Sequence, residues 1–188
     1  MGRDTPALRL FVAAYPPEAL ARQMLEAARR LGPSDCRWTP VDQVHLTLQF
    51  MGRVPPREVD EVCEGIERSG AGLGPMLLTC ERLITLPERG RPRLVALETD
   101  APSALLELKR RLASRLARNV RPDPAGRFRP HLTLCRFSRS ARPTRVNEPV
   151  SLEPFRIDRI RLMRSELRPD GAHHAEIGVF QLLGDSKA

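Results

Sequence analysis

The sequence is poor in lysine, in aromatic residues and in long apolar runs. Among 31 basic residues the only lysines are Lys109 and Lys187, and aromatic residues make up 4% of the 188 positions. Leucine, valine, isoleucine and alanine must therefore fill the core. No apolar run approaches the roughly 20 residues that cross a membrane, and the N-terminus has no apolar signal core behind a basic start. We expect a cytoplasmic protein without membrane association.

The sequence also lacks the motifs that hold metals or drive nucleotide-dependent ligation. Its four cysteines form no Cys-x-x-Cys pair and no cluster mixed with histidine, which argues against a zinc site and a disulfide framework. No Gly-x-x-x-x-Gly-Lys phosphate loop is found. We therefore expect reduced thiols, no metal and no cofactor.

Positive charge is abundant, at a net +8, and it comes almost entirely from arginine. Arginine suits phosphate because its planar fork donates two parallel hydrogen bonds, but codon bias in a GC-rich genome gives the same composition. Composition alone does not favour an anionic partner over codon bias, or the reverse. Two basic stretches, "PERGRPR" at 87–93 and "PAGRFRP" at 124–130, are expected to be loops whose arginines could meet backbone phosphates of an anionic partner.

Helical and strand patterns alternate along the chain. The apolar periodicity predicts strands at 7–14, 76–86, 93–99, 154–167 and 173–183, and helices at 17–31, 56–69 and 102–119. This order predicts an α+β fold. The length suits one domain, residues 1–188, built from two lobes.

The tetrapeptide His-Leu-Thr-Leu occurs twice, at residues 45–48 and 131–134. The two copies lie about half the chain length apart, and each is preceded by a helix and accompanied by further strands. That arrangement indicates a weak internal duplication, with two lobes of like construction around a central cleft.

Each copy is predicted to be a strand that carries reactive groups on one face. Because side chains alternate, His45 and Thr47 share a face with both leucines opposite, and His131 and Thr133 do the same. A neutral imidazole can take a proton from water and an imidazolium can give one to a leaving oxygen, while hydroxyls hold phosphate oxygens. A buried packing histidine is the alternative for either copy alone. The repetition favours phosphoester chemistry without a metal.

The residues around the second copy follow from the same alternation. Arg129, two residues before His131, is expected on the histidine face as a charged contact to phosphate. Cys135 is expected on that face as a wall of the cleft, whereas Arg136 falls on the other face unless the strand bends. His173 and His174 stand beside the turn signal "PDG", so we expect a surface pair.

The flanks of the two motifs carry a family resemblance. "RWTPVDQVHLTLQFMG" and "FRPHLTLCRF", together with "RLFVAAYPPE" and "PRLVALE", resemble the 2H phosphoesterase superfamily. The closer similarity is to the RNA 2′,3′-cyclic phosphodiesterases, also called 2′-5′ RNA ligases. The resemblance implies two pseudo-symmetric α+β lobes, each with an antiparallel sheet, around a cleft that holds both His-x-Thr-x motifs.

The resemblance also implies a reaction and its residues. RNA 2′,3′-cyclic phosphodiester ends would be hydrolysed to 2′-phosphomonoesters without a cofactor. His45 would be the proton donor and His131 the proton acceptor. Thr47 and Thr133 would bind the phosphate, and Arg136 matches the arginine of the family's second motif.

Several alternatives stay open at this point. The substrate is expected to be RNA with a 2′,3′-cyclic phosphate end, tRNA fragments among them, or a nucleoside 2′,3′-cyclic phosphate, and the protein is expected to be a monomer. A phosphodiesterase acting on small cyclic nucleotides and a 2′-5′ RNA ligase are related possibilities. Noncatalytic binding of RNA ends is a different class, but binding alone needs no symmetric histidine pair.

Overall fold

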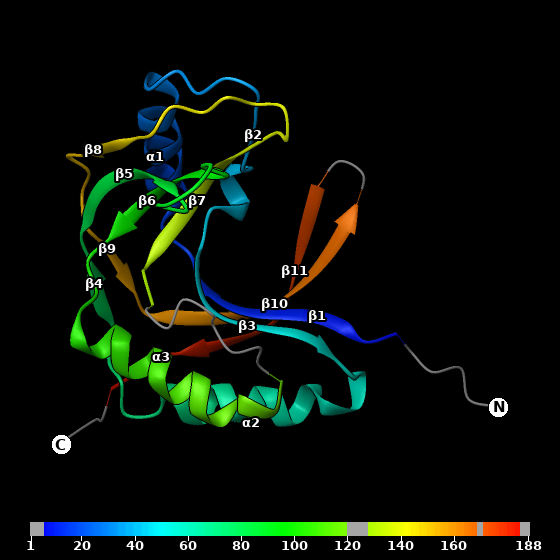
Figure 1. Ribbon diagram of the computed structural model, residues 1–188. Helices are drawn as coiled ribbons and strands as arrows, with labels where there is room; N and C mark the ends of the chain where they lie inside the picture. The colour runs from blue at the N-terminus through cyan, green and yellow to red at the C-terminus, as the bar shows by residue number, and fades with distance from the viewer. Residues whose placement is uncertain (1–5, 120–127, 169–170, 185–188) are drawn as a thin grey trace.

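A computed structural model describes residues 6–119, 128–168 and 171–184 (Figure 1). Of the stretch 124–130, which is predicted to be a basic loop, residues 124–127 lie outside the described part of the chain. The elements, in chain order, are β1 (Leu8–Ala14), α1 (Glu18–Arg30), β2 (Cys36–Trp38), η1 (Val41–Gln43), β3 (Leu46–Val54), η2 (Pro56–Glu58), α2 (Val59–Gly70), β4 (Met76–Leu78), β5 (Cys80–Leu86), β6 (Leu94–Thr99), α3 (Ser103–Arg115), η3 (Ala117–Asn119), β7 (His131–Phe137), β8 (Asn147–Pro149), β9 (Phe155–Ile157), β10 (Arg159–Arg168) and β11 (Gly171–Gln181).

One large antiparallel sheet dominates the structure. It has nine strands in the order β11-β10-β1-β3-β7-β6-β5-β8, with β2 paired to β7 beside this path. A separate two-stranded sheet joins β4 and β9. The predicted α+β class with antiparallel pairing is therefore confirmed.

The sheet consists of two similar halves joined at its centre. The segment β1-α1-β3 in the first half corresponds to β6-α3-β7 in the second, and β3 meets β7 through the pair Leu46–Leu132. Helix α1 contacts β7 and helix α3 contacts β3, so each repeat's helix packs against the strand of the other repeat. The two predicted lobes therefore correspond to two halves of one continuous sheet.

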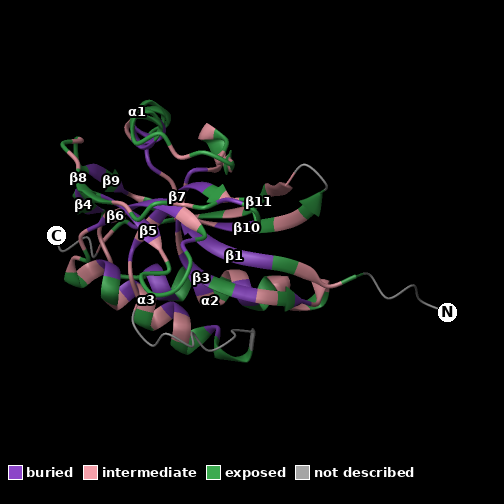
Figure 2. Cartoon of the chain, turned by 45° about the horizontal axis from the view of Figure 1, so that its top comes forward, coloured by how far each residue is buried: buried purple, intermediate pink, exposed green. Residues whose placement is uncertain are grey.

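The core lies on one face of the sheet and draws on both halves. The leucines at helical spacing on α3 form a buried apolar stripe, in which Leu105, Leu108 and Leu112 are inaccessible to solvent. Truncation of such a leucine to alanine costs about 2–5 kcal/mol of stability. Figure 2 shows buried positions along the central strands and exposed positions on the outer sides of the helices. A second, small buried cluster on β1 and β10 contains Phe11, with Tyr15 packed against it.

Two predicted strands are each divided in the structure. The stretch 76–86 is split at Thr79, whose backbone N–H donates to Asp100 Oδ1 at 2.8 Å instead of continuing one ladder. The stretch 154–167 is split at Asp158 because its two parts join different sheets: β9 pairs with β4, and β10 pairs with β1. Among the helices that can be described, none combines the length and apolar character needed to cross a membrane.

Candidate active site at the centre of the sheet

The two copies of the tetrapeptide meet where the halves of the sheet join. Leu46 pairs antiparallel with Leu132, and their exposed fractions are 1% and 0%. The histidine and the threonine of each copy are half-buried and alternate with these leucines. The leucines therefore fix the join in the core while the reactive side chains lie on the opposite face.

The join brings the two motifs to one point. His45, Thr47, His131 and Thr133 are each one residue away from the Leu46–Leu132 pair, and the charge of His131 lowers the pKa of His45. Two imidazoles and two hydroxyls thus gather on one small area of the sheet.

Both imidazole rings are held in the same way. Nδ1 of His45 lies 2.7 Å from the carbonyl oxygen of Gln43, and Nδ1 of His131 lies 2.8 Å from that of Arg129. A carbonyl oxygen only accepts hydrogen bonds, so each Nδ1 donates its hydrogen to the residue two positions before. The neutral ring then carries its lone pair on Nε2, which leaves Nε2 as the atom that exchanges protons in both histidines.

A β-bulge in β7 overturns the simple alternation predicted after Thr133. Thr133 pairs with Ala96 and Cys135 with Val95, so two steps on β7 match one step on β6. Cys135 is consequently buried in the core, and its predicted place as a wall of the cleft is wrong. Arg136 is exposed. The sequence predicted that Arg136 could reach the histidine face only if the strand bends, and the bulge is such a bend.

The first motif has a bulge at the matching position. Thr47 pairs with Ala13 and Gln49 with Val12, so the extra residue again follows the threonine. Gln49 is buried like Cys135, and Phe50 is exposed at 65%, in the place that Arg136 occupies in the second motif. The two motifs therefore share a backbone shape but end in different side chains.

Arg129 has partners other than the predicted phosphate. Its guanidinium forms ion pairs with Glu88 and Glu98, including a bond of 3.0 Å from Nη2 to Glu98 Oε2. The charge predicted for a phosphate contact is thus already matched by two carboxylates. In this structure it is the backbone carbonyl of Arg129 that serves the site, by orienting His131.

The surroundings of His45 contain three rings that the sequence patterns did not single out as site residues. The ring centroids of Phe11, Tyr15 and His174 lie 5.0, 5.5 and 5.2 Å from that of His45. Tyr15 Oη and His174 Nδ1 are buried and have no hydrogen-bond partner within the described parts of the chain. The predicted surface position is therefore wrong for His174. Alternation along β1 was an available signal for Phe11 and Tyr15, since both share a face with Ala13, the partner of Thr47.

Electrostatics set the protonation state of the pair. The pKa of His45 is lowered to about 4, mainly by burial and further by the charges of His174, Arg136 and His131, while the hydrogen bond to the Gln43 carbonyl opposes this shift. The pKa of His131 is also lowered, first by burial and then by the positive charge of Arg136 and of Arg129. Both imidazoles are therefore neutral at pH 7 before an anion binds. Within the described ranges, no three His, Cys, Asp or Glu side chains gather as a ligand set for a metal ion.

Comparison with known proteins places this fold and site in a family. The model of the 2′-5′ RNA ligase superfamily matches residues 16–169. Because the match spans most of the sequence, the chain belongs to the 2′-5′ RNA ligase superfamily, and the predicted family resemblance is confirmed.

Individual relatives agree with this assignment. The chain is 29% identical over 190 residues to an RNA 2′,3′-cyclic phosphodiesterase of Thermus thermophilus, with 95% of this chain and 92% of the relative covered. The crystal structure of the Thermus thermophilus protein TT0787 superposes with a TM-score of 0.82 at 28% identity, covering 95% of this chain and 100% of that one. E. coli LigT complexed with 3′-AMP shares the fold, with a TM-score of 0.78, 23% identity and coverage of 95% and 99%.

Proposed function

We propose that this protein hydrolyses 2′,3′-cyclic phosphodiesters at RNA ends to 2′-phosphomonoesters. The observation that carries the proposal is the pair of identically held imidazoles, each donating Nδ1–H to the carbonyl two residues before, on strands that cross at Leu46–Leu132. Membership of the 2′-5′ RNA ligase superfamily and the activity named for the Thermus thermophilus relative support it.

The reaction needs one base and one acid. His131, neutral in the free protein, takes a proton from water through Nε2, and the water oxygen attacks phosphorus. When the phosphate anion binds, His45 takes up a proton from solvent on Nε2; as the bond from phosphorus to O3′ breaks, His45 gives this proton to O3′. The 2′-phosphomonoester leaves, and proton exchange with solvent restores both imidazoles.

The other polar groups bind the phosphate. Thr47 and Thr133 follow the two histidines by two residues, are half-buried like them, and donate their hydroxyl hydrogens to nonbridging oxygens. Arg136, which has no hydrogen bond or ion pair to another described side chain, supplies the positive charge that favours the anion. Because one chain contributes both motifs, we expect a monomer to suffice, and we expect cytoplasmic RNA fragments, tRNA fragments among them, as substrates.

Incubation with a short RNA bearing a 2′,3′-cyclic end tests the reaction. The expected product is the 2′-phosphomonoester, identified by phosphorus NMR, with turnover unaffected by EDTA. His45→Ala and His131→Ala should each lower turnover by about two to four orders of magnitude, the usual range for a lost general acid or base.

Control variants and a second substrate separate the possible failures. His173→Ala removes an imidazole outside the proposed pair and should retain activity. A cyclic phosphate with a good leaving group needs no acid, so it should rescue His45→Ala but not His131→Ala. RNA binding without turnover in the wild type would instead support the noncatalytic alternative.

A further inference from the structure

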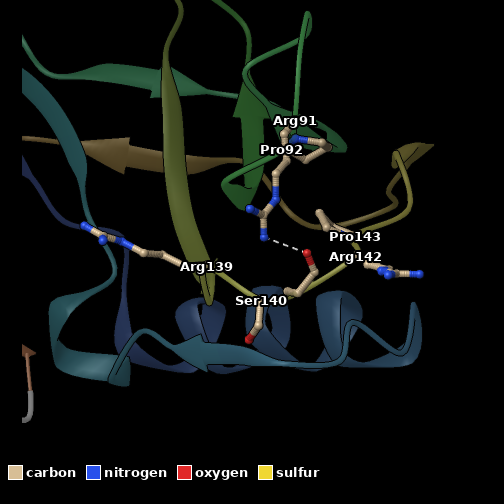
Figure 3. A pocket seen from close by; sticks show the side chains of 7 residues that line it. Arg91, Pro92, Arg139, Ser140, Arg142 and Pro143 are labelled. Carbon is tan, nitrogen blue, oxygen red and sulfur yellow. Dashed lines mark hydrogen bonds between the residues drawn. The ribbon is translucent and has the colours of Figure 1, made fainter.

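A basic pocket lies at the end of β7, away from the histidines. Its volume is about 450 Å³, and it is formed by the loop between β5 and β6 together with the segment after β7 (Figure 3). Arg91, Arg139 and Arg142 line it, together with Pro92, Ser140, Ala141 and Pro143. The positive charge of three arginines around one pocket suits an anionic ligand.

The two segments are bound to each other by arginines that donate to backbone carbonyls. Arg91 Nη2 donates to the carbonyl oxygens of Ser138 at 3.1 Å and Ala141 at 2.6 Å. In return, Arg145 Nη1 donates to the carbonyl oxygen of Pro87 at 3.2 Å, and Arg145 also bonds the carbonyl of Gly90. These bonds hold the pocket in shape, and because carbonyls are neutral they leave the full positive charge in place.

The positive charge of this pocket is not balanced by carboxylates in the described part of the chain. Some arginines on α1, α2, α3 and the β10–β11 hairpin pair with glutamates, as Arg22 does with Glu18 and Arg161 with Glu176, whereas others on the helices, such as Arg29 and Arg115, form no such pair within the described ranges. Among the described residues, Arg91, Arg139 and Arg142 form no ion pair with a carboxylate. What sets this place apart is that three such arginines line a single pocket.

The pocket is connected to the histidine pair by further positive charge. Strand β7 begins at His131 and ends at Phe137, about 20 Å away at about 3.3 Å per residue, and the pocket follows directly. Between them, Arg136 lies opposite Arg37 across the β2–β7 pair. Figure 3 shows the side chains of Arg139 and Arg142 pointing away from each other, so the positive charge is spread along this side of the molecule instead of converging on one point.

We propose that this pocket binds backbone phosphate of an RNA chain whose cyclic end is at the histidines, a few nucleotides away. The inference rests on the proposed function and makes it more specific, because it assigns an oligonucleotide rather than a mononucleotide as the substrate. The contacts are to phosphate, so they position the RNA without reading its sequence.

The test compares two substrates and two charge-matched double variants. Arg139→Gln/Arg142→Gln removes two cations from the pocket but leaves Arg91 to hold the loops. Arg57→Gln/Arg115→Gln removes the same charge from exposed positions on the helical side of the molecule. Each is assayed on a ten-nucleotide RNA with a 2′,3′-cyclic end and on a nucleoside 2′,3′-cyclic phosphate.

The pocket variant should raise the KM for RNA about fivefold or more at low salt and leave the mononucleotide unchanged. The slope of log KM against log salt should fall by about 0.7 for each phosphate that the variant no longer binds, the value for single strands. In the wild type, KM should drop once the RNA is long enough to reach from the histidines to the pocket. Equal effects of the two double variants, or a KM independent of RNA length, would overturn the proposal.

Failure of the proposed function gives a different pattern. If the wild type hydrolyses neither substrate, fluorescence anisotropy with an RNA that ends in a 2′-phosphate still tests the pocket. Weaker binding by the pocket variant alone would support the RNA contact without the reaction, whereas unchanged binding would reject it. Hydrolysis of the mononucleotide with no RNA effect in the variant would reject the pocket and keep the reaction.

Discussion

Binding of an anion at the histidine pair should be coupled to uptake of a proton by His45. Burial holds the pKa of this residue at about 4 in the free protein, so the ring is neutral at pH 6, although the proposed acid must carry two protons. An anion about 4 Å from the imidazolium supplies about 4 kcal/mol at an effective dielectric constant near 20. At about 1.4 kcal/mol per tenfold change in proton affinity, this brings the pKa of His45 into the neutral range.

Sulfate is the simplest probe, because its charge is constant between pH 5 and pH 8. Calorimetry at pH 6 in two buffers with different ionisation enthalpies gives the number of protons taken up on binding. We expect about one proton for the wild type and for His131→Gln, and about none for His45→Gln. By linkage, sulfate affinity should also rise up to about tenfold for each unit by which the pH is lowered from 7.5.

Two results would refute this reasoning. Sulfate binding without proton uptake in the wild type would mean that the anion does not stabilise a charged imidazole. Uptake that survives His45→Gln and disappears in His131→Gln would assign the acid role to the second motif. Titration of the ring protons by NMR, without sulfate, checks the starting point independently.

Three other perturbations follow from the site. Thr47→Ala and Thr133→Ala should each cost about 1–3 kcal/mol in kcat/KM, the scale of a hydrogen bond to a charged group, and serine should restore most of it; serine variants as poor as alanine would show that the hydroxyls do not act. His174→Ala should raise the pKa of His45, because it opens the ring to water and removes a neighbouring positive charge, and an NMR titration that shows no rise would contradict this contact. His45 binds a proton near pH 6.5 in the unfolded chain but only near pH 4 in the folded protein, so the free energy of unfolding should fall as the pH drops from 6.5 to 4, by at most about 3 kcal/mol. Urea unfolding measures this change, and the free energy of unfolding of His45→Gln should depend less on pH than that of the wild type.

The sequence predicted the features that depend on local periodicity. The buried stripe of α3, the strand at 8–14 and the exposed side of each His-Leu-Thr-Leu copy follow from spacing alone, and the structure has them in place. The bulges after Thr47 and Thr133 depend on which strand lies alongside, so a count of alternating residues placed Cys135 on the wrong face.

Long-range contacts account for the other differences. His174 reaches His45 only because β11, β10, β1 and β3 follow one another in the sheet. Arg129 finds Glu98 because β6 lies beside β7, and no short stretch of sequence contains that information. Local spacing therefore located the motifs but not the neighbours that tune them.

The near-twofold arrangement of the motifs has a consequence for how acid and base are told apart. If the halves were identical, the two imidazoles would be equivalent, and neither would be committed to giving or to taking the proton. The two His-Leu-Thr-Leu copies themselves do not break this equivalence, because their backbone shape and their Nδ1 bonds are the same, although the residues that follow them, Phe50 and Arg136, differ. The asymmetry comes from the surroundings: aromatic rings and a third imidazole enclose His45, whereas an arginine held by two glutamates lies behind His131. We expect that a transplant of these surroundings from one half to the other would exchange the proposed acid and base roles while both motifs stayed unchanged.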